Sequence, residues 1–246
     1  HADTMDNYLI LGMVMFWAGF IQGLTGFGSA LVAMPLLMPL LGPRTAAPLM
    51  ILSSVMLQVI LIVHYRQAFS FRAVWRLAMA SLLMIPAGVF LVRFIDERWI
   101  LVGLSVVLIG YSIYALTGLR LPRLEGTGWA YLCGALSGVL GGACNTDGPP
   151  IIIYGNCRRW EPQEFKGNLQ AFFMVNTAAI LISHAVAGGF MPTVWRAAGV
   201  TLPSLIIGSV LGLSLDRFIN AAVFRKLCLV LLILLGLRLG KIALGL

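Results

Sequence analysis

Residues 134–150 read GALSGVLGGACNTDGPP, a glycine-rich run that carries one carboxylate, Asp147, and ends in two prolines. Residues 19–35 read GFIQGLTGFGSALVAMP and repeat this pattern. At an offset of 115 positions the copies share three glycines and a proline, which are Gly19, Gly23, Gly26 and Pro35 in the first copy. Glycine and proline interrupt helices. The two runs therefore indicate an internal duplication with one broken helix in each half.

Composition places the chain in a membrane. Of its 246 residues, 60% are hydrophobic and 11% charged, whereas a soluble domain has about a quarter charged residues. Apolar runs of span length recur without strand-like alternation, which indicates an all-α polytopic membrane protein rather than a barrel. We expect ten hydrophobic segments, at roughly 8–25, 28–42, 46–65, 73–92, 99–118, 128–145, 149–157, 167–188, 194–215 and 222–243.

The duplication extends beyond the glycine-rich runs. After an insertion of five residues the offset becomes 120, which places His64 on His184, Trp75 on Trp195, Gly88 on Gly208 and Asp96 on Asp216. We therefore expect a tail at 1–7, a first transmembrane repeat at 8–118, a linker at 119–127 and a second repeat at 128–246. The first four residues of the tail precede an internal Met5, as residues left over from an expression tag would. Five segments per half is an odd number, so the second repeat must be inverted, and the breaks can meet near the midplane.

Positive charge predicts the orientation. With the acidic start outside, the loops near 66–76, 119–125, 157–166 and 217–226 face the cytoplasm and carry 11 of the 17 Lys and Arg residues. This bias favours a multi-pass protein of a bacterial-type cytoplasmic membrane with both termini outside. Cations in short loops set topology and contact membrane lipids, so the net charge of +8 does not indicate nucleic-acid binding.

A broken helix exposes backbone N–H groups, and these donors together with the helix dipole suit an anion. We expect the breaks and the third segment of each half to supply the substrate site. Its predicted members are Gln22, Thr25, Gly26, Gly28, Ser29, Ser54, Gln58, Gly141, Gly142, Asn145, Thr146, Gly148, Gln170 and Asn176. For the side chains among them, hydrogen bonding between helices is the alternative. The pairs Gly19/Gly23 and Gly134/Gly138 are typical of close helix packing.

Asp147 is the sharpest single candidate, because a carboxylate within a membrane is costly and usually functional. It could couple transport to protons, cap the helix that restarts at Pro149, or lie in water at the interface. At the offset of 115 its counterpart is Val32, so the halves are not chemically equivalent. His64 and His184 stand at helix ends, where a histidine is usually solvated but could titrate.

Stretches Gly19–Leu37 and Gly134–Tyr154 resemble the sulfite exporter TauE/SafE (TSUP) family, in which a glycine-rich segment runs into a short proline-bearing helix. The resemblance covers the layout of nearly the whole chain. It implies a secondary transporter that moves small sulfur-containing anions such as sulfite, sulfoacetate and related organosulfonates, often outward. Where members of that family commonly have glycine, this chain has Asn145, Thr146 and Asp147.

The sequence supports two other functions less strongly. A carrier or channel for another small anion, such as a carboxylate or thiosulfate, is the first alternative. An intramembrane enzyme using Asp147 is the second, although hydrolysis usually needs a partner acid or base. The four cysteines are isolated, and no Walker A loop, H-E-x-x-H run or Cys/His cluster occurs. We expect no catalytic residues, no metal and no cofactor.

Overall fold

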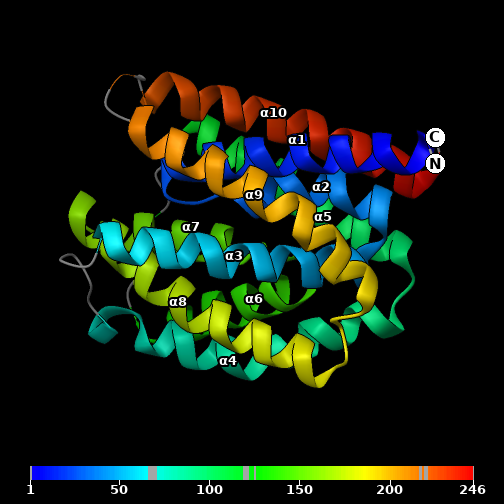
Figure 1. The fold of residues 1–246 in the computed structure, drawn as a ribbon. Helices are drawn as coiled ribbons and strands as arrows, with labels where there is room; N and C mark the ends of the chain where they lie inside the picture. The colour runs from blue at the N-terminus through cyan, green and yellow to red at the C-terminus, as the bar shows by residue number, and fades with distance from the viewer. Residues whose placement is uncertain are drawn as a thin grey trace.

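The computed structural model describes residues 2–65, 71–118, 122–124, 126–215, 218 and 221–245. These residues form ten helices and no strand (Figure 1). The helices are α1 (Ala2–Thr25), α2 (Ser29–Leu41), α3 (Pro43–Tyr65), α4 (Phe71–Phe94), α5 (Glu97–Thr117), α6 (Gly128–Cys144), α7 (Gly148–Arg158), α8 (Pro162–Val186), α9 (Pro192–Leu215) and α10 (Ala221–Leu244). Seven of these ten are long and apolar enough to cross a membrane. The predicted all-α polytopic architecture is confirmed.

Both predicted helix breaks are present. Helix α1 ends at Thr25 and α2 starts at Ser29, with Gly26 and Gly28 between them at φ of 79° and 100°. Helix α6 ends at Cys144 and α7 starts at Gly148, with Asn145 at φ of 53°. Positive φ costs glycine little and asparagine less than most residues. The composition of each run therefore explains why the helix stops there.

The structural register of the two halves differs from the sequence-based one. Thr25 and Cys144 end equivalent helices, Ser29 and Gly148 begin the next pair, and Pro43 and Pro162 begin the third. Each of these pairs lies 119 positions apart, not 115.

The error of four residues has a simple cause. Glycines in these runs recur every four residues, one helical turn, so a shift by one turn still superposes glycine on glycine. In the register of 119, Gly19 and Gly23 correspond to Gly138 and Gly142. Asp147 then corresponds to Gly28 rather than Val32, so the two halves still differ at this position.

The second repeat is inverted relative to the first, as predicted. Near the end of α3, Gln58 bonds to Gln170 near the start of α8, whereas Pro48 near the start of α3 lies beside Gly189 just after α8. Equivalent helices α3 and α8 therefore run antiparallel. Both termini lie at one end of the bundle (Figure 1). Which face of the membrane this end occupies stays a prediction.

Glycines interlock the two halves. The first helix of each half packs on the fourth helix of the other half, α1 on α9 and α6 on α4. A Cβ atom at Gly23 would collide with the carbonyl oxygen of Ser209, and one at Gly138 with that of Ser81. These contacts confirm that the G-x-x-x-G pairs serve close helix packing.

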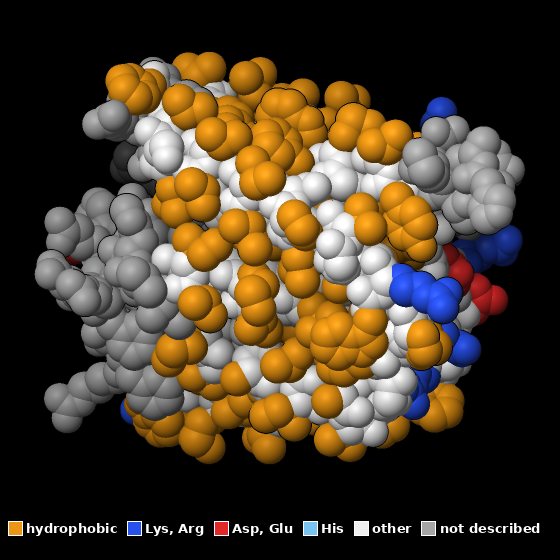
Figure 2. Space-filling model, in the orientation of Figure 1, with side chains coloured by type: hydrophobic (Ala, Val, Ile, Leu, Met, Phe, Trp, Pro, Cys, Tyr) orange, Lys and Arg blue, Asp and Glu red, His pale blue; other side chains and the backbone are white. Residues whose placement is uncertain are grey.

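On the face shown in Figure 2 the exterior of the bundle is apolar along its length, and the Lys and Arg side chains coloured there lie mainly near the end where the termini lie. Exposed side chains such as Leu83, Phe90, Ile182 and Leu234 cover the flanks. An apolar belt of this kind suits lipid contact. The polar groups that matter for function therefore have to be sought inside the bundle.

Candidate functional site

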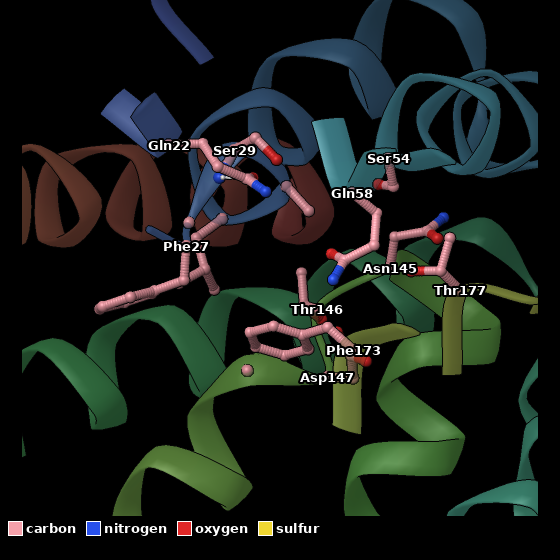
Figure 3. A pocket seen from close by; sticks show the side chains of 14 residues that line it. Gln22, Phe27, Ser29, Ser54, Gln58, Asn145, Thr146, Asp147, Phe173 and Thr177 are labelled. Atoms are coloured by element: carbon pink, nitrogen blue, oxygen red, sulfur yellow. Dashed lines mark hydrogen bonds between the residues drawn. The ribbon is translucent and has the colours of Figure 1, made fainter. Parts of the chain in front are cut away.

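The two helix breaks meet at one internal cavity of about 50 Å³ (Figure 3). Side chains from the first break, from α3, from the second break and from α8 surround it. The lining residues are Gln22, Phe27, Gly28, Ser29, Ala30, Leu31, Ser54, Gln58, Asn145, Thr146, Asp147, Gly148, Phe173 and Thr177. Segments more than 100 residues apart in the sequence thus contribute to one site.

Helix α2 presents the start of its first turn to this cavity. The backbone N–H of Ser29 donates to Gln22 Oε1 over 3.2 Å, and the following residues Ala30 and Leu31 line the cavity. N–H groups in the first turn of a helix have no partner within the helix. The start of α2 therefore offers backbone donors and the positive end of a helix dipole.

Helix α7 offers fewer donors. It starts at Gly148, and the next two residues, Pro149 and Pro150, have no backbone N–H. Its dipole still directs partial positive charge toward the cavity, but Gly148 supplies the first-turn hydrogen-bond donor there. The two breaks are thus alike in shape and different in chemistry.

Asp147 does not cap α7. Asp147 occupies the capping position but its side chain makes no capping hydrogen bond. A capping side chain accepts from the second or third N–H of the helix, and here both positions are proline. The carboxylate instead accepts a hydrogen bond of 2.9 Å from Asn176 Nδ2 on α8. The capping role considered for Asp147 is therefore wrong, and the carboxylate lines the cavity between the two breaks instead.

Amide side chains tie the breaks to the third helix of each half. Gln58 Nε2 donates to Gln170 Oε1 over 2.9 Å, and Gln170 Nε2 donates to the carbonyl of Gly26 over 3.1 Å. At the second break, Asn145 Nδ2 donates to the carbonyl of Ala47 over 2.9 Å. These bonds hold the two breaks in place around the cavity.

Three polar atoms near the cavity are buried without a hydrogen-bond partner: Asn145 Oδ1, Thr146 Oγ1 and Asn176 Oδ1. Buried polar groups in native proteins are nearly always paired with protein or water. The Thr146 hydroxyl can donate to a bound anion, and the two amide oxygens can accept from water. The unpaired atoms are therefore consistent with an occupant.

Charge at this site comes from one side chain. Asp147 is the only ionisable residue among those that line the cavity, and no Lys, Arg or His is among them. An anion bound there would be held by backbone dipoles and uncharged side chains. It would also be repelled by Asp147 whenever that carboxylate is ionised.

Most of the predicted site residues lie at this cavity. Its lining includes nine of them: Gln22, Gly28, Ser29, Ser54, Gln58, Asn145, Thr146, Asp147 and Gly148. Three more bond to lining groups or to the break itself, namely Gly26, Gln170 and Asn176.

The remaining three predicted residues do not line the cavity. The hydroxyl of Thr25 donates to the carbonyl of Ile21 one turn earlier. Gly141 lies behind the side chain of Asp147, and Gly142 packs against the backbone of α4 at Ile85. The small size of the two glycines leaves room for the bend and for the packing of α6 on α4.

Sequence reasoning missed two aromatic residues, Phe27 and Phe173, and the backbone of Ala30 and Leu31. A signal for Phe173 was present, because residues 170, 173 and 177 share one helix face. Phe27 lies within the first break, where no periodicity applies. The ring of Phe173 lies beside the polar groups of the cavity (Figure 3), and Phe27 also lines it.

His184 is buried, with 3% of its surface exposed, so the expectation of a solvated histidine at the interface is wrong. The loop after α8 and helix α3 cover it, through Gly189 and Pro48. The side chain of His64 and all of Asp216 lie outside the described residues.

Comparison with known proteins agrees with this architecture. The model of the family described as Sulfite exporter TauE/SafE matches residues 11–239. A curated protein from Cupriavidus necator named "Probable sulfite/organosulfonate exporter TauE" is 25% identical over 224 residues, which cover 88% of this chain and 87% of that protein. No solved structure matches the chain significantly.

Proposed function

This chain belongs to the sulfite exporter TauE/SafE family of membrane transporters, and we propose that it carries a small sulfur-containing oxyanion through the cavity between its two helix breaks. The cargo class is sulfite, sulfoacetate or a related organosulfonate. Export across the cytoplasmic membrane is the proposed direction. The curated relative is named as an exporter of this kind, which supports the proposal at the level of class.

The start of α2 at the cavity is the observation that carries the proposal. Broken helices in transporters direct their N-terminal ends at anionic groups of the substrate. Here Ser29, Ala30 and Leu31 of the first turn of α2 line the cavity, and uncharged polar side chains from α3 and the second break complete it. This set can bind an oxyanion by hydrogen bonds without a fixed countercharge, so release stays easy.

Cavity volume favours a small cargo. A water molecule needs roughly 10–15 Å³ of such volume, and the cavity has about 50 Å³. This volume suits a small anion better than a large one. A larger organosulfonate would require the walls at Phe27 and Phe173 to move outward.

Membrane potential is sufficient to drive export when the cargo and any accompanying proton together carry one net negative charge. Moving one negative charge outward across an inside-negative potential of about 100 mV releases roughly 2.3 kcal/mol. At 1.4 kcal/mol per tenfold, this corresponds to a gradient of about 50-fold for a monoanion. No nucleotide is needed for such a step.

Another small anion is the main alternative, and a chemical reaction is less well supported. Thiosulfate or a small carboxylate could use the same donors. Catalysis would have to rely on Asp147, which is the single ionisable residue among those lining the cavity and is already paired with Asn176. Acid–base hydrolysis usually employs a second titratable group.

A stability screen tests the cargo class directly. A ligand that binds the folded state raises the melting temperature by mass action. We expect purified protein in detergent to be stabilised by sulfite more than by sulfate, acetate or the zwitterion taurine at equal ionic strength. Thiosulfate and sulfoacetate test the alternatives. A response to carboxylates alone would refute the sulfur-anion assignment.

A further inference from the structure

A second, larger cavity opens at the end of the bundle where both termini lie. It has a volume of about 350 Å³ and lies between the start of α3, the end of α4 and the loop that joins α8 to α9. Its lining residues include Arg44, Arg93, His184, Pro48, Val89 and Gly189. We refer to this space as the vestibule.

Two cationic side chains at the vestibule are free of salt bridges within the described residues. Arg44 and Arg93 are both exposed, and Arg44 Nη2 donates to the backbone carbonyl of Arg93 over 2.9 Å. Asp96, the nearest carboxylate along the chain, accepts instead from the backbone N–H of Arg98 and is not part of the lining. The guanidinium groups therefore keep donors available for an anion.

A buried histidine, His184, also lines the vestibule. It is 3% exposed, and its Nε2 atom is buried without a hydrogen-bond partner. Its Nδ1 atom lies toward Gly189 in the vestibule wall.

The vestibule is separated from the central cavity by the C-terminal end of α6. Pro48 of the vestibule follows Ala47, whose carbonyl accepts from Asn145 of the central cavity. Val89 of the vestibule lies against the backbone at Gly142, one turn before that asparagine. These residues thus form a wall that the two spaces share.

We propose that the vestibule is a second anion site, which holds the transported oxyanion between the central cavity and the aqueous phase at the termini end. The two arginines and the buried histidine can bind an oxyanion by charge and hydrogen bonds. The shared wall places this site directly beside the central cavity. This inference rests on the proposed function, because it takes the same cargo. A lipid phosphate has the same chemistry, so added phospholipid is one arm of the test below.

Isothermal titration of the full chain in detergent with sodium sulfite tests the proposal. We expect two sites in the unmodified protein. The double variant R44Q/R93Q should retain the central site unchanged. Its vestibule site should bind sulfite at least about tenfold more weakly, because both charge-assisted donors are lost. The control variant R98Q/R196Q changes two exposed arginines outside the vestibule lining and should keep both sites.

Further variants and conditions distinguish a wrong vestibule site from a wrong proposed function. His184→Gln should weaken the same site as R44Q/R93Q, whereas Gln58→Leu in the central cavity should remove the other one. An isotherm of R44Q/R93Q that matches that of R98Q/R196Q would overturn the vestibule site alone. If added phosphatidylglycerol abolishes sulfite binding there, a lipid is the occupant and the proposal is wrong. Absence of any sulfite binding together with absence of flux would instead refute the proposed function.

Discussion

Asn176 on α8 donates a hydrogen bond of 2.9 Å to the carboxylate of Asp147. Asp147 directly precedes α7, yet its carboxylate makes no hydrogen bond to the start of that helix. The carboxylate is thereby fixed against the central cavity rather than against backbone N–H groups. An anion and an ionised carboxylate in one small cavity repel each other strongly at low dielectric. Proton uptake by Asp147 would remove this repulsion, so we propose that proton uptake accompanies binding of the cargo.

The variant Asp147→Asn tests this coupling. If binding requires the protonated carboxylate, flux of the unmodified protein should rise as pH falls. The variant keeps the shape of the side chain but cannot titrate, so it should lose this pH dependence and still exchange anion at equilibrium. Flux should be measured in proteoliposomes with a sulfonate, whose own charge is constant near neutral pH. A pH profile unchanged by the substitution would refute the coupling role.

Two adjacent serines form a matched test and control for binding at the cavity. Ser53 and Ser54 each donate to the carbonyl four residues earlier over 2.9 Å, but Ser54 lines the cavity and Ser53 does not. Because the Ser54 hydroxyl can rotate from the carbonyl of Met50 to donate to the anion, Ser54→Ala should weaken sulfite binding by about three- to tenfold, the value of roughly one hydrogen bond. Ser53→Ala should bind normally. Equal affinities of the two variants, measured by titration, would argue against the cavity as the site.

Gly142 and Gly148 should respond differently to substitution. A Cβ atom at Gly148 would meet the side chains of Ile152 and Phe173 at 3.7 Å, which is ordinary van der Waals contact, and Gly148 lines the cavity. Gly148→Leu should therefore fold but block sulfite flux. Gly142→Ala would force α6 away from α4 at Ile85 and should lower stability by about 1–3 kcal/mol. Thermal unfolding followed by fluorescence size-exclusion chromatography measures the stability of both variants, and flux in proteoliposomes measures transport by Gly148→Leu. A normal melting temperature for Gly142→Ala would contradict the packing role.

Orientation in the membrane is open to a labelling test. The charge bias predicts that both termini lie outside. Leu244, 65% exposed at the end of α10, can be changed to cysteine in a background in which Cys228 is serine. A membrane-impermeant maleimide should label it in intact cells. A cysteine at Arg123 in the linker should react only after permeabilisation, and the reverse result would invert the topology.

Much of the architecture was readable from residue types. Apolar run lengths located the helices, and glycine and proline located both breaks. The register of the halves was wrong by one turn, because glycines spaced by four residues match at either offset. The failure of Asp147 to cap α7 was also readable, since Pro149 and Pro150 have no N–H to offer.

Tertiary contacts account for what sequence reasoning could not find. His184 is buried because Pro48 and the loop at Gly189 cover it, and no local pattern records such coverage. The vestibule likewise combines Arg44, Arg93 and His184 from three separate segments. Whether Gly142 contacts a ligand or a neighbouring helix depends on which face of α6 meets α4, and glycine spacing alone does not distinguish these cases.

Efflux of sulfite from proteoliposomes that contain the purified protein tests the central claim most directly. With an inside-negative potential, preloaded sulfite should leave faster than from protein-free liposomes, saturate with concentration, and be blocked by Gly148→Leu, although that variant folds. Efflux at the protein-free rate, or efflux that Gly148→Leu leaves unchanged at equal reconstitution, would contradict transport of this anion through the cavity between the two breaks.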